Sequence, residues 1–310
     1  QQGHAALYRL RKGDPDLLFS DPGPLTESLL LAIPGKGISR PVLSPDGKQA
    51  IYTRRWVDKL NDRWESSLWI MGDDGAKNRF LVNGGAVEWS PDGQRIAYIA
   101  RGEPAGAQIF VRWMDAEGSI SQVTRLTEAP SDLQWSPDGK SLAFRMAVPY
   151  RESWSIPVPA APKGAKWVEP PRIVTKLDYR QDRLGFNDDA YQHIFVVSAE
   201  GGTPRQITSG SWDHGAPQWM PDGKTIVFAA NRVADAEYSW RQSDVYAVDV
   251  TGGAIKQLTT RSGPDGQPAP SPDGKLIAYT GFDHTTDTWR DQQLYVMNAD
   301  GSSARSLTPQ

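Results

Sequence analysis

The amino-acid sequence predicts an all-β protein, a β-propeller made of four-stranded blades. Three observations lead to this prediction: a Ser-Pro-Asp-Gly turn recurs, strand-like runs accompany each copy, and the copies follow one another at a regular spacing. In such a turn Pro presets φ at the second position, Asp caps the backbone at the third, and Gly takes the fourth. The copies are Ser44–Gly47, Ser90–Gly93, Ser136–Gly139 and Ser271–Gly274, and Met220–Gly223 is a variant that keeps Pro-Asp-Gly.

The first two strands of each unit flank this turn. A short apolar segment precedes the turn and ends in Trp89, Trp135 or Trp219 in three of the units. A second apolar run with an aromatic end comes after the turn, which is the pattern of a β-hairpin. These runs are Ala50–Tyr52, Ile96–Tyr98, Leu142–Phe144, Ile226–Phe228 and Ile277–Tyr279. We expect the three Trp side chains to be buried between neighbouring sheets, because their large faces suit sheet stacking.

Two further runs complete each unit. The third strand is apolar, and its copies are Leu68–Met71, Ile109–Val111, Ile194–Val197, Val245–Val248 and Leu294–Met297. The fourth is more polar, and its copies are Arg79–Val82, Val123–Thr127, Arg205–Thr208, Lys256–Thr259 and Arg305–Thr308. The prolines of successive turns lie 46, 46, 84 and 51 residues apart. Chance recurrence of a common turn would not bring matched strands each time, so each copy is interpreted as one propeller blade.

These units predict five full blades, at about 41–83, 86–127, 132–208, 216–259 and 268–308. The long third interval places an insertion at 146–192 of the third blade, and its Pro residues suit a central strand poorly. We expect this insertion to hold a hairpin of its own around Arg172–Tyr179. A degenerate extra blade is the alternative.

The N-terminal region bears on the number of blades. Residues 1–24 resemble the last two strands of a partial blade, and Leu25–Ile33 suits a short helix at the start of the propeller domain, 25–310. Five blades and a partial one do not obviously close a ring, and an open array leaves unpaired edge strands. We therefore expect a truncated seven- or eight-bladed ring. Closure by five or six blades, with residues 1–20 as an outer clasp, is the alternative.

Composition argues against several classes of function. The formal net charge is −3 and no basic cluster stands out, so nucleic acid is not an expected partner. No stretch approaches the ~18 apolar residues of a membrane span. The chain has no Cys, which excludes disulfides, thiolate metal sites and a cysteine nucleophile but leaves the compartment open. The absence of an initial Met favours an exported or periplasmic protein with its signal peptide removed, although a cytoplasmic location stays open.

The connections between second and third strands predict a functional face. They are long and irregular in sequence, and in a propeller they emerge on one side of the disc: Arg54–Ser67, Ala100–Gln108, Met146–His193, Ala230–Asp244 and Gly281–Gln293. Arg and aromatic side chains are enriched where proteins bind partners. The candidate binding residues are Arg54, Arg101, Arg145, Arg232, Trp64, Trp240, Trp289 and, near the pore, His214. The structural alternative is Trp packed over blade edges and Arg paired with loop carboxylates.

No catalytic centre is visible in the sequence. The strained Gly-x-Ser-x-Gly turn that carries the nucleophile of an α/β-hydrolase does not occur. The four His residues stand far apart and in no metal-binding frame, and the acidic groups match no calcium loop. We expect no metal and no cofactor, and we expect the chain to be inactive alone.

The repeated Ser-Pro-Asp-Gly-Lys units, the run Leu25–Leu30, and the stretch Tyr179–Thr208 with Gly201-Gly202-Thr203-Pro204-Arg205 together resemble a known family. The chain is similar over about 25–310 to the propeller domain of the prolyl oligopeptidase family of serine peptidases, nearest to its acylaminoacyl-peptidase and dipeptidyl-peptidase-like branch. TolB-like propellers share the Ser-Pro-Asp-Gly units. Residues 1–24 depart from the usual start of the family, and Arg183 stands where the family has Gly.

The resemblance implies a division of labour. A C-terminal α/β-hydrolase domain, missing from this chain, would carry Ser, Asp and His and cleave peptide bonds. The propeller would gate that site and help to bind short peptides. The alternative function is a TolB-like scaffold that binds proteins or peptides and has no catalytic partner. The part of the gene downstream of Gln310 separates the two, and a His-rich domain there would instead indicate a metal-dependent amidohydrolase.

Overall fold

The computed structural model describes residues 38–150, 159–167, 174, 176–182, 185–187, 189–284 and 290–308. Within these residues the protein is all-β, with five four-stranded antiparallel sheets and one two-stranded sheet. None of these residues forms a helix that is long and apolar enough to cross a membrane. The expected partial blade at 1–24 and the expected helix Leu25–Ile33 lie outside the described residues.

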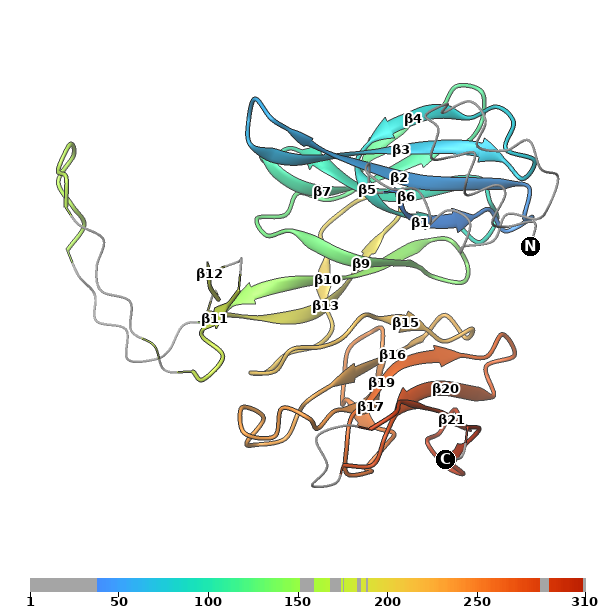
Figure 1. The fold of residues 1–310 in the computed structure, drawn as a ribbon, viewed down its shortest axis with the longest axis vertical. Coiled ribbons are helices and arrows are strands. Elements are labelled where there is room, and N and C mark those ends of the chain that lie inside the picture. Colours follow the sequence, from blue (N-terminus) through green and yellow to red (C-terminus); the bar gives the residue numbers. More distant parts are fainter. Residues whose placement is uncertain are drawn as a thin grey trace.

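Each four-stranded sheet corresponds to one copy of the sequence unit (Figure 1). The first contains β1 (Ile38–Leu43), β2 (Gln49–Asp58), β3 (Arg63–Gly72) and β4 (Arg79–Asn83). The second contains β5 (Gly85–Trp89), β6 (Arg95–Gly102), β7 (Gly106–Trp113) and β8 (Ile120–Gln122). The third contains β9 (Pro130–Trp135), β10 (Ser141–Pro149), β13 (Ala190–Ser198) and β14 (Arg205–Gln206). The fourth contains β15 (Gln218–Trp219), β16 (Thr225–Ala230), β17 (Asp244–Asp249) and β18 (Lys256–Gln257).

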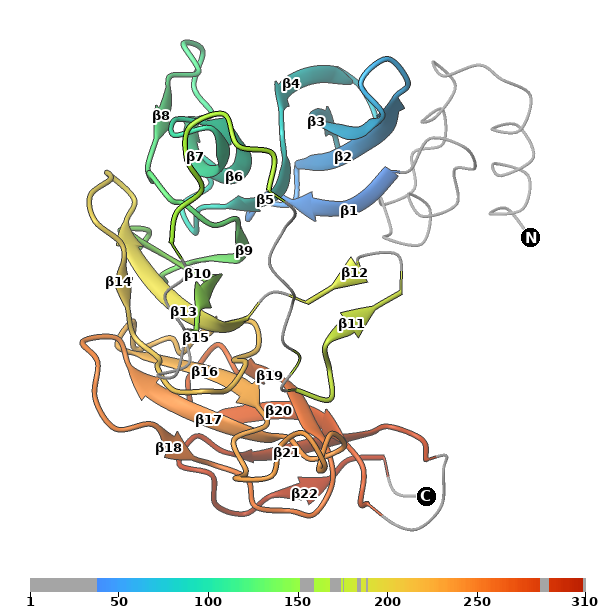
Figure 2. The ribbon, with the colours of Figure 1, turned by 90° about the vertical axis from the view of Figure 1, so that its left-hand side faces the viewer.

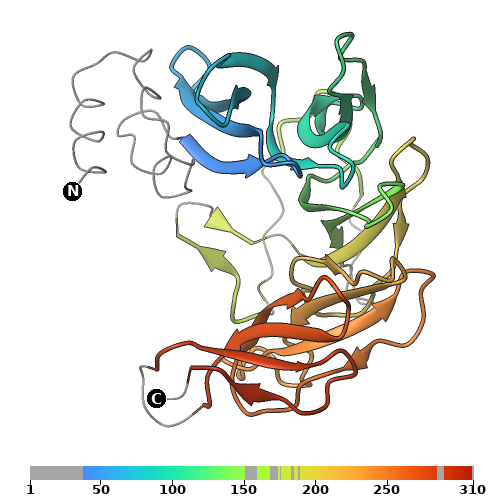
Figure 3. The ribbon, with the colours of Figure 1, turned by 90° about the vertical axis from the view of Figure 1, so that its right-hand side faces the viewer.

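The fifth sheet contains β19 (Asp265–Pro270), β20 (Leu276–Gly281), β21 (Gln293–Asn298) and β22 (Arg305–Ser306). The five sheets succeed one another around an arc in chain order (Figures 2 and 3). Their first strands face the inside of the arc and contact one another, β1 with β5, β5 with β9, β9 with β15, and β15 with β19. Four-stranded sheets that fan around an axis make a β-propeller, so the predicted fold is confirmed.

The Ser-Pro-Asp-Gly turns form as their chemistry predicts. In the first copy the Gly47 N–H donates to the Ser44 carbonyl at 2.8 Å, and Gly47 has a φ of 72°, which an L side chain adopts reluctantly. The Ser44 hydroxyl donates to Asp46 at 2.7 Å and accepts the N–H of Gln49 at 2.9 Å, so it ties the turn to the next strand. The same pair of bonds recurs at Ser90, Ser136 and Ser271.

The three Trp residues join each sheet to the one before it. Their indole N–H groups donate to main-chain carbonyls of the preceding inner strand: Trp89 to Val42 at 3.2 Å, Trp135 to Glu88 at 3.1 Å, and Trp219 to Gln134 at 3.3 Å. Trp89 and Trp135 are buried as expected, whereas Trp219 is only partly buried. The expectation of a buried Trp is therefore wrong for Trp219, although the indole makes the same bond.

Other contacts reinforce particular junctions. Between the second and third sheets, the guanidinium of Arg95 lies between the rings of Trp113 and Trp135, and its Nη2 donates to the Gly139 carbonyl at 2.7 Å. The fifth sheet has Pro270 where the second, third and fourth sheets have Trp, so no indole from this position can bridge the junction. Instead the Asp265 N–H donates to the Ser243 carbonyl at 2.8 Å, and the Ser243 hydroxyl donates to the Asp265 carbonyl at 2.9 Å.

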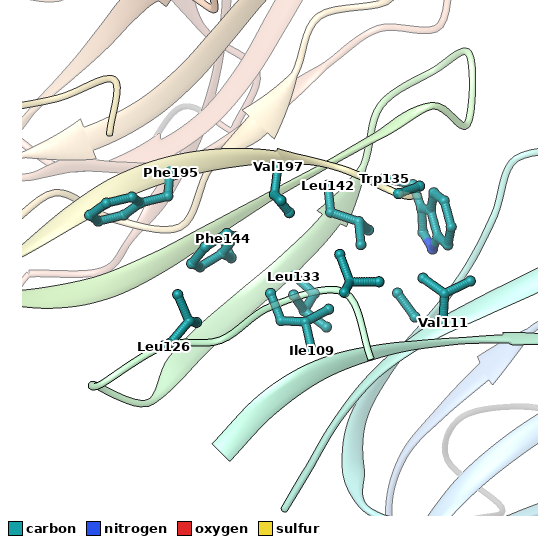
Figure 4. Close-up of a cluster of buried hydrophobic side chains, with 12 residues drawn as sticks. Ile109, Val111, Leu126, Leu133, Trp135, Leu142, Phe144, Phe195 and Val197 are labelled. Carbon is teal, nitrogen blue, oxygen red and sulfur yellow. The ribbon is translucent and has the colours of Figure 1, made fainter. Parts of the chain in front are cut away.

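The hydrophobic core is divided among the spaces between sheets. Figure 4 shows one of these clusters, where Ile109 and Val111 of β7 face Leu142 and Phe144 of β10. Alternation along each strand sends every second side chain to one face, so each sheet contributes to the core on either side of it. The inner strands β1, β5, β9 and β19 each shift register against their neighbours, and Ala86, Asp132 and Gln267 have positive φ at these irregularities.

The connections on the predicted functional face differ from expectation. Arg54–Ser67 and Ala100–Gln108 are not irregular loops, because β2 pairs with β3 as far as Asp58 and Arg63, and β6 pairs with β7 as far as Gly102 and Gly106. The first of these turns is capped by Asp58, whose carboxylate accepts the N–H groups of Leu60 and Asn61. Local capping and cross-strand pairing therefore extend these strands into segments whose polar residues had predicted loops.

Strands are also longer than predicted on both sides of the inserted segment. β10 and β13 remain paired from Ser141–Ser198 to Pro149–Ala190, so both strands run into the range assigned to the insertion. The expected hairpin around Arg172–Tyr179 lies partly outside the described residues; the pairing observed next to it joins β11 (Arg180–Gln181) to β12 (Gly185–Phe186). Arg172 itself lies outside the described residues. The described part of the insertion contains no four-stranded sheet that could serve as an extra blade.

Candidate functional site

Three of the predicted site residues come together where the third and fourth sheets meet on the loop side. Arg145 lies on β10, Arg232 comes after β16, and His214 forms an isolated bridge with Ala230 at the start of the inner edge of the fourth sheet. Arg145 and Arg232 both hydrogen-bond to His214, so a single residue connects the two arginines. We refer to Asp132, Arg145, Trp212, His214 and Arg232 as the arginine cluster.

His214 is completely buried and its ring is held from both nitrogens. Nδ1 lies 3.0 Å from the Gln192 carbonyl, which can only accept, so Nδ1 carries the proton. Nε2 lies 2.7 Å from Nη1 of Arg232, which can only donate, so Nε2 accepts. The ring is therefore neutral and fixed in one tautomer, with the rings of His193 at 5.0 Å and Phe228 at 5.3 Å.

Burial sets the protonation state of both histidines. It lowers the pKa of His214 to about 4, against the opposing effect of the hydrogen bond to Gln192. Burial also lowers the pKa of His193, which Asp213 partly offsets. Neither imidazole has the ordinary titration of a general base near neutral pH. The neutral ring of His214 instead accepts a hydrogen bond from Arg232, and the ring of His193 packs against it.

Arg145 is paired with a carboxylate. Its Nε and Nη2 both lie 2.6 Å from Oδ2 of Asp132, and its Nη1 donates to the His214 carbonyl at 3.1 Å. Asp132 stands at the irregularity of β9 with a φ of 52°, and this bulge sets the position of its carboxylate. The charge of Arg145 is thus neutralised within the cluster.

Arg232 has a different environment. Its guanidinium lies over the ring of Trp212 at 4.6 Å and near that of Tyr246 at 5.7 Å. Among the described residues no carboxylate forms an ion pair with it. Burial lowers the pKa of Arg232, and Tyr246 acts in the opposite direction. Because an Arg side chain stays protonated at any ordinary pH, Arg232 is a half-buried cation without a counter-charge in this part of the chain.

The other predicted site residues lie elsewhere. Arg54 folds back over the ring of Trp69 at 4.5 Å, and Arg101 lies 3.7 Å from the Glu65 carboxylate. Trp64 and Trp240 are exposed, at 63% and 72%, each beneath a neighbouring arginine. Trp289 lies outside the described residues. The predicted set is therefore divided between the arginine cluster and separate surface positions.

Three residues of this region were not predicted as site residues from the sequence: Asp132, Trp212 and His193. Asp132 could not be found from its spacing, because its position depends on a bulge in β9. Trp212 stands two residues before His214, and its ring packs against a loop from the next hairpin, where its indole donates to Val233 at 3.3 Å. His193 lies opposite Met146 in the pairing of β10 with β13. This position could not be predicted, because the predicted insertion at 146–192 ended these strands too early.

A second polar cluster joins the fourth and fifth sheets. Asp265 is completely buried and pairs with Arg261, while Asp244 accepts hydrogen bonds from Thr259 and Gln242 at 3.2 Å each. Burial raises the pKa of both carboxyls. No group of three or more His, Cys, Asp or Glu among the described residues is arranged to hold a metal ion.

Known proteins that are similar to this chain include peptidases. Residues 163–286 match the family model "Dipeptidyl peptidase IV (DPP IV) N-terminal region". The uncharacterized peptidase YuxL of Bacillus subtilis is 30% identical over 224 residues, which are 67% of this chain and 32% of that protein. Dipeptidyl-peptidase 5 of Porphyromonas endodontalis is 27% identical over 288 residues, which are 86% of this chain and 40% of that protein.

These similarities support a propeller domain of the prolyl oligopeptidase family. The chain spans well under half the length of the two peptidases, 32% and 40%. The acylaminoacyl peptidase of Pyrococcus horikoshii has the same fold over 88% of this chain and 39% of its own, with a TM-score of 0.65 and 17% identity. The Tol-Pal system protein TolB of Francisella tularensis is 27% identical over 225 residues, 69% of this chain and 48% of that protein.

Proposed function

We propose that this propeller gates and helps to bind short peptides for a serine peptidase domain that lies outside the chain. The main support is the similarity to proteins named as peptidases, of which the chain covers 32% and 40%. The sequence itself has no Gly-x-Ser-x-Gly turn, so acyl transfer needs another domain. The arginine cluster and the exposed Trp64 and Trp240 provide polar and aromatic groups on the loop side, where such a domain would dock.

The fold would suit selection of substrates by size, because its tight turns and its variable connections lie on opposite sides. The tight Ser-Pro-Asp-Gly turns lie on one side, and the connections between second and third strands lie on the other, where those of the third, fourth and fifth sheets are long. The insertion between β10 and β13 is the longest of these connections and would lie at or near the junction with the hydrolase domain. Loops on a rigid scaffold can limit the size of substrates that reach a catalytic centre.

The reading frame downstream of Gln310 tests the proposal directly. A Gly-x-Ser-x-Gly turn and, after it, Asp and His support a peptidase, and a stop codon contradicts it. In a full-length enzyme, removal of residues 150–189, with Pro149 and Ala190 rejoined by a short turn, should change the ratio of cleavage rates for long and short peptides. An unchanged ratio would argue against gating by the insertion.

The second candidate is a TolB-like binding scaffold without a catalytic partner. The similarity to TolB, 27% over 225 residues, favours it. Under this alternative the loop side would bind a protein or a peptide and no cleavage would occur. Both candidates expect the 310-residue chain alone to leave peptides intact, so the downstream reading frame distinguishes them better than an activity assay does.

A further inference from the structure

We infer that Arg232 is a binding site for the carboxylate of a peptide ligand. This inference rests on the proposed peptide-binding function and names the chemical group that the loop side would recognise. The observation behind it is the missing counter-charge: Arg232 is half-buried, it contacts two aromatic rings, and its Nη1 hydrogen-bonds to a neutral imidazole. Cations withdrawn from water are normally paired, because desolvation is costly.

Among the described residues, neither Asp132 nor Asp213 forms an ion pair with Arg232. Asp132 accepts the Nε and Nη2 groups of Arg145, both at 2.6 Å. Asp213 accepts the N–H of Gln192 at 2.7 Å through Oδ1. Since His193 and His214 are neutral, the arginine cluster carries one positive charge more than its negative charges. An added anion would balance this excess.

The geometry favours a planar anion. Arg232 uses Nη1 to hydrogen-bond to His214, and the ring of Trp212 lies along one face of the guanidinium. These contacts fix the plane of the group while leaving N–H donors at its edge. A guanidinium edge of this kind matches the two oxygens of a carboxylate, which an ammonium group cannot do. The fixed tautomer of His214 adds to this, because its Nε2 can only orient the arginine and cannot compete for an anion.

Arg145 tunes the site through Asp132. Both arginines contact His214, Arg145 at the carbonyl and Arg232 at the ring, so they lie within the span of one residue. As long as Asp132 is ionised, Arg145 is neutralised and only Arg232 attracts an anion. Replacing Asp132 with Asn would leave Arg145 without its counter-charge, and Asn tolerates the φ of 52° at this position. The cluster therefore allows variants that act in opposite directions.

The test uses the 310-residue chain and two probes, N-acetyl-Ala-Phe with a free carboxylate and the same peptide with a C-terminal amide, in calorimetric titrations at low salt. We expect the acid to bind about 10- to 100-fold more tightly than the amide, the range of one charge-assisted pair. Arg232→Gln should abolish the difference, Arg232→Lys should weaken it, and Asp132→Asn should enlarge it. Arg241→Gln removes an equal charge from the same loop, where Arg241 lies over Trp240, and should leave the difference unchanged.

The outcomes separate this inference from the proposed function. Equal binding of acid and amide, unaffected by Arg232→Gln, would overturn the carboxylate site and leave peptide binding intact. Binding of neither peptide would overturn both the carboxylate site and direct peptide binding by this domain. Inorganic phosphate that binds where the acid does not would also overturn the inference. Thermal unfolding of each variant shows whether it is folded, and Arg232→Lys remains informative where Arg232→Gln is not.

Discussion

At the scale of single residues, the Trp that ends an inner strand has two roles. Its ring fills the space between sheets, and its indole N–H satisfies a main-chain carbonyl of the preceding sheet, as in the 3.1 Å bond from Trp135 to Glu88. An inner strand offers such a carbonyl because it is the edge strand of its sheet, where part of the main-chain groups have no partner within the sheet. The residue thus combines apolar burial with hydrogen bonding, which few other side chains can do.

Truncation of these residues should destabilise the protein in proportion to burial. We expect Trp135→Ala to lower the free energy of unfolding by roughly 3–5 kcal/mol. Trp219→Ala should cost less, because Trp219 is only partly buried. Urea unfolding measures both, and Trp240→Ala at an exposed position is the control, with little effect. Equal losses for Trp135 and Trp219 would contradict this explanation.

His214 makes the stability depend on pH. The folded protein holds its pKa at about 4, whereas an unfolded chain has the ordinary value of 6.5. Between these values the unfolded state binds a proton that the folded state rejects, so stability falls as pH decreases from 6.5 to about 4 and then levels off. The whole contribution amounts to about 3 kcal/mol at 1.36 kcal/mol per unit.

Unfolding free energies of the wild type and His214→Gln, measured from pH 7 to pH 4, check this dependence. The variant should lose less stability across the range than the wild type does. The buried carboxyls of Asp244 and Asp265 have raised pKa values and act in the opposite direction, but they are present in both proteins and cancel in the comparison. Parallel pH profiles would exclude His214 as the cause.

At the scale of elements, the turn shows how one motif tolerates variation. In the fourth unit Met220 replaces Ser and cannot accept the N–H of the residue five positions later. Asp222 compensates, because its Oδ1 accepts the N–H of both Lys224 and Thr225, at 2.8 Å and 2.9 Å. Pro, Asp and Gly therefore determine the turn, and Ser strengthens its link to the next strand.

The Ser residues of these turns should differ in their contribution to stability. The Ser90 hydroxyl is buried and accepts the Arg95 N–H at 2.9 Å, so Ser90→Ala leaves a buried donor unsatisfied and should cost about 1–3 kcal/mol. Ser271→Ala removes the same bond where water can replace it, and should cost less. Denaturant unfolding compares the two variants, and a larger loss at Ser271 would be the contrary result.

The pattern of turns and apolar runs sufficed to predict these elements, since both depend on local chemistry. The hairpin between β2 and β3 was predicted less well, because Arg55 and Glu65 have the polarity of a loop although they lie in paired strands. The arginine cluster was found only in part. Arg145, Arg232 and His214 could be selected because of their residue types. The position of Asp132 depends on a bulge and on contact between two sheets, which cannot be predicted from a local sequence pattern.

At the scale of the whole molecule, the sheets are not equally covered. Phe144 and Ile194 in the third sheet are completely buried. The fifth sheet leaves Leu276, Leu294 and Leu307 about 40% exposed, at 41%, 40% and 43%. A sheet with one covered face should open at a lower free energy than a sheet with two.

Native-state hydrogen exchange measured by mass spectrometry tests this order. Amides of β20 and β21 should exchange faster than those of β10 and β13 under conditions where opening limits the rate. The buried pair Phe144 and Phe195 provides an internal reference for the slowest exchange. Equal protection in the third and fifth sheets would mean that the five sheets open as one unit.

The bonds that join neighbouring sheets have a mechanical consequence. Trp89 holds the first junction beside the tight turns, and the ion pair of Arg101 with Glu65 holds its opposite rim. At the second junction the bonds of Trp135 and Arg95 both lie beside the tight turns. The third junction is held at both rims, by Trp219 and by Arg145, and the fourth is held through Ser243. Among the described residues, the second junction is therefore hydrogen-bonded at one rim, and parting of its loop side would swing the first two sheets away from the last three.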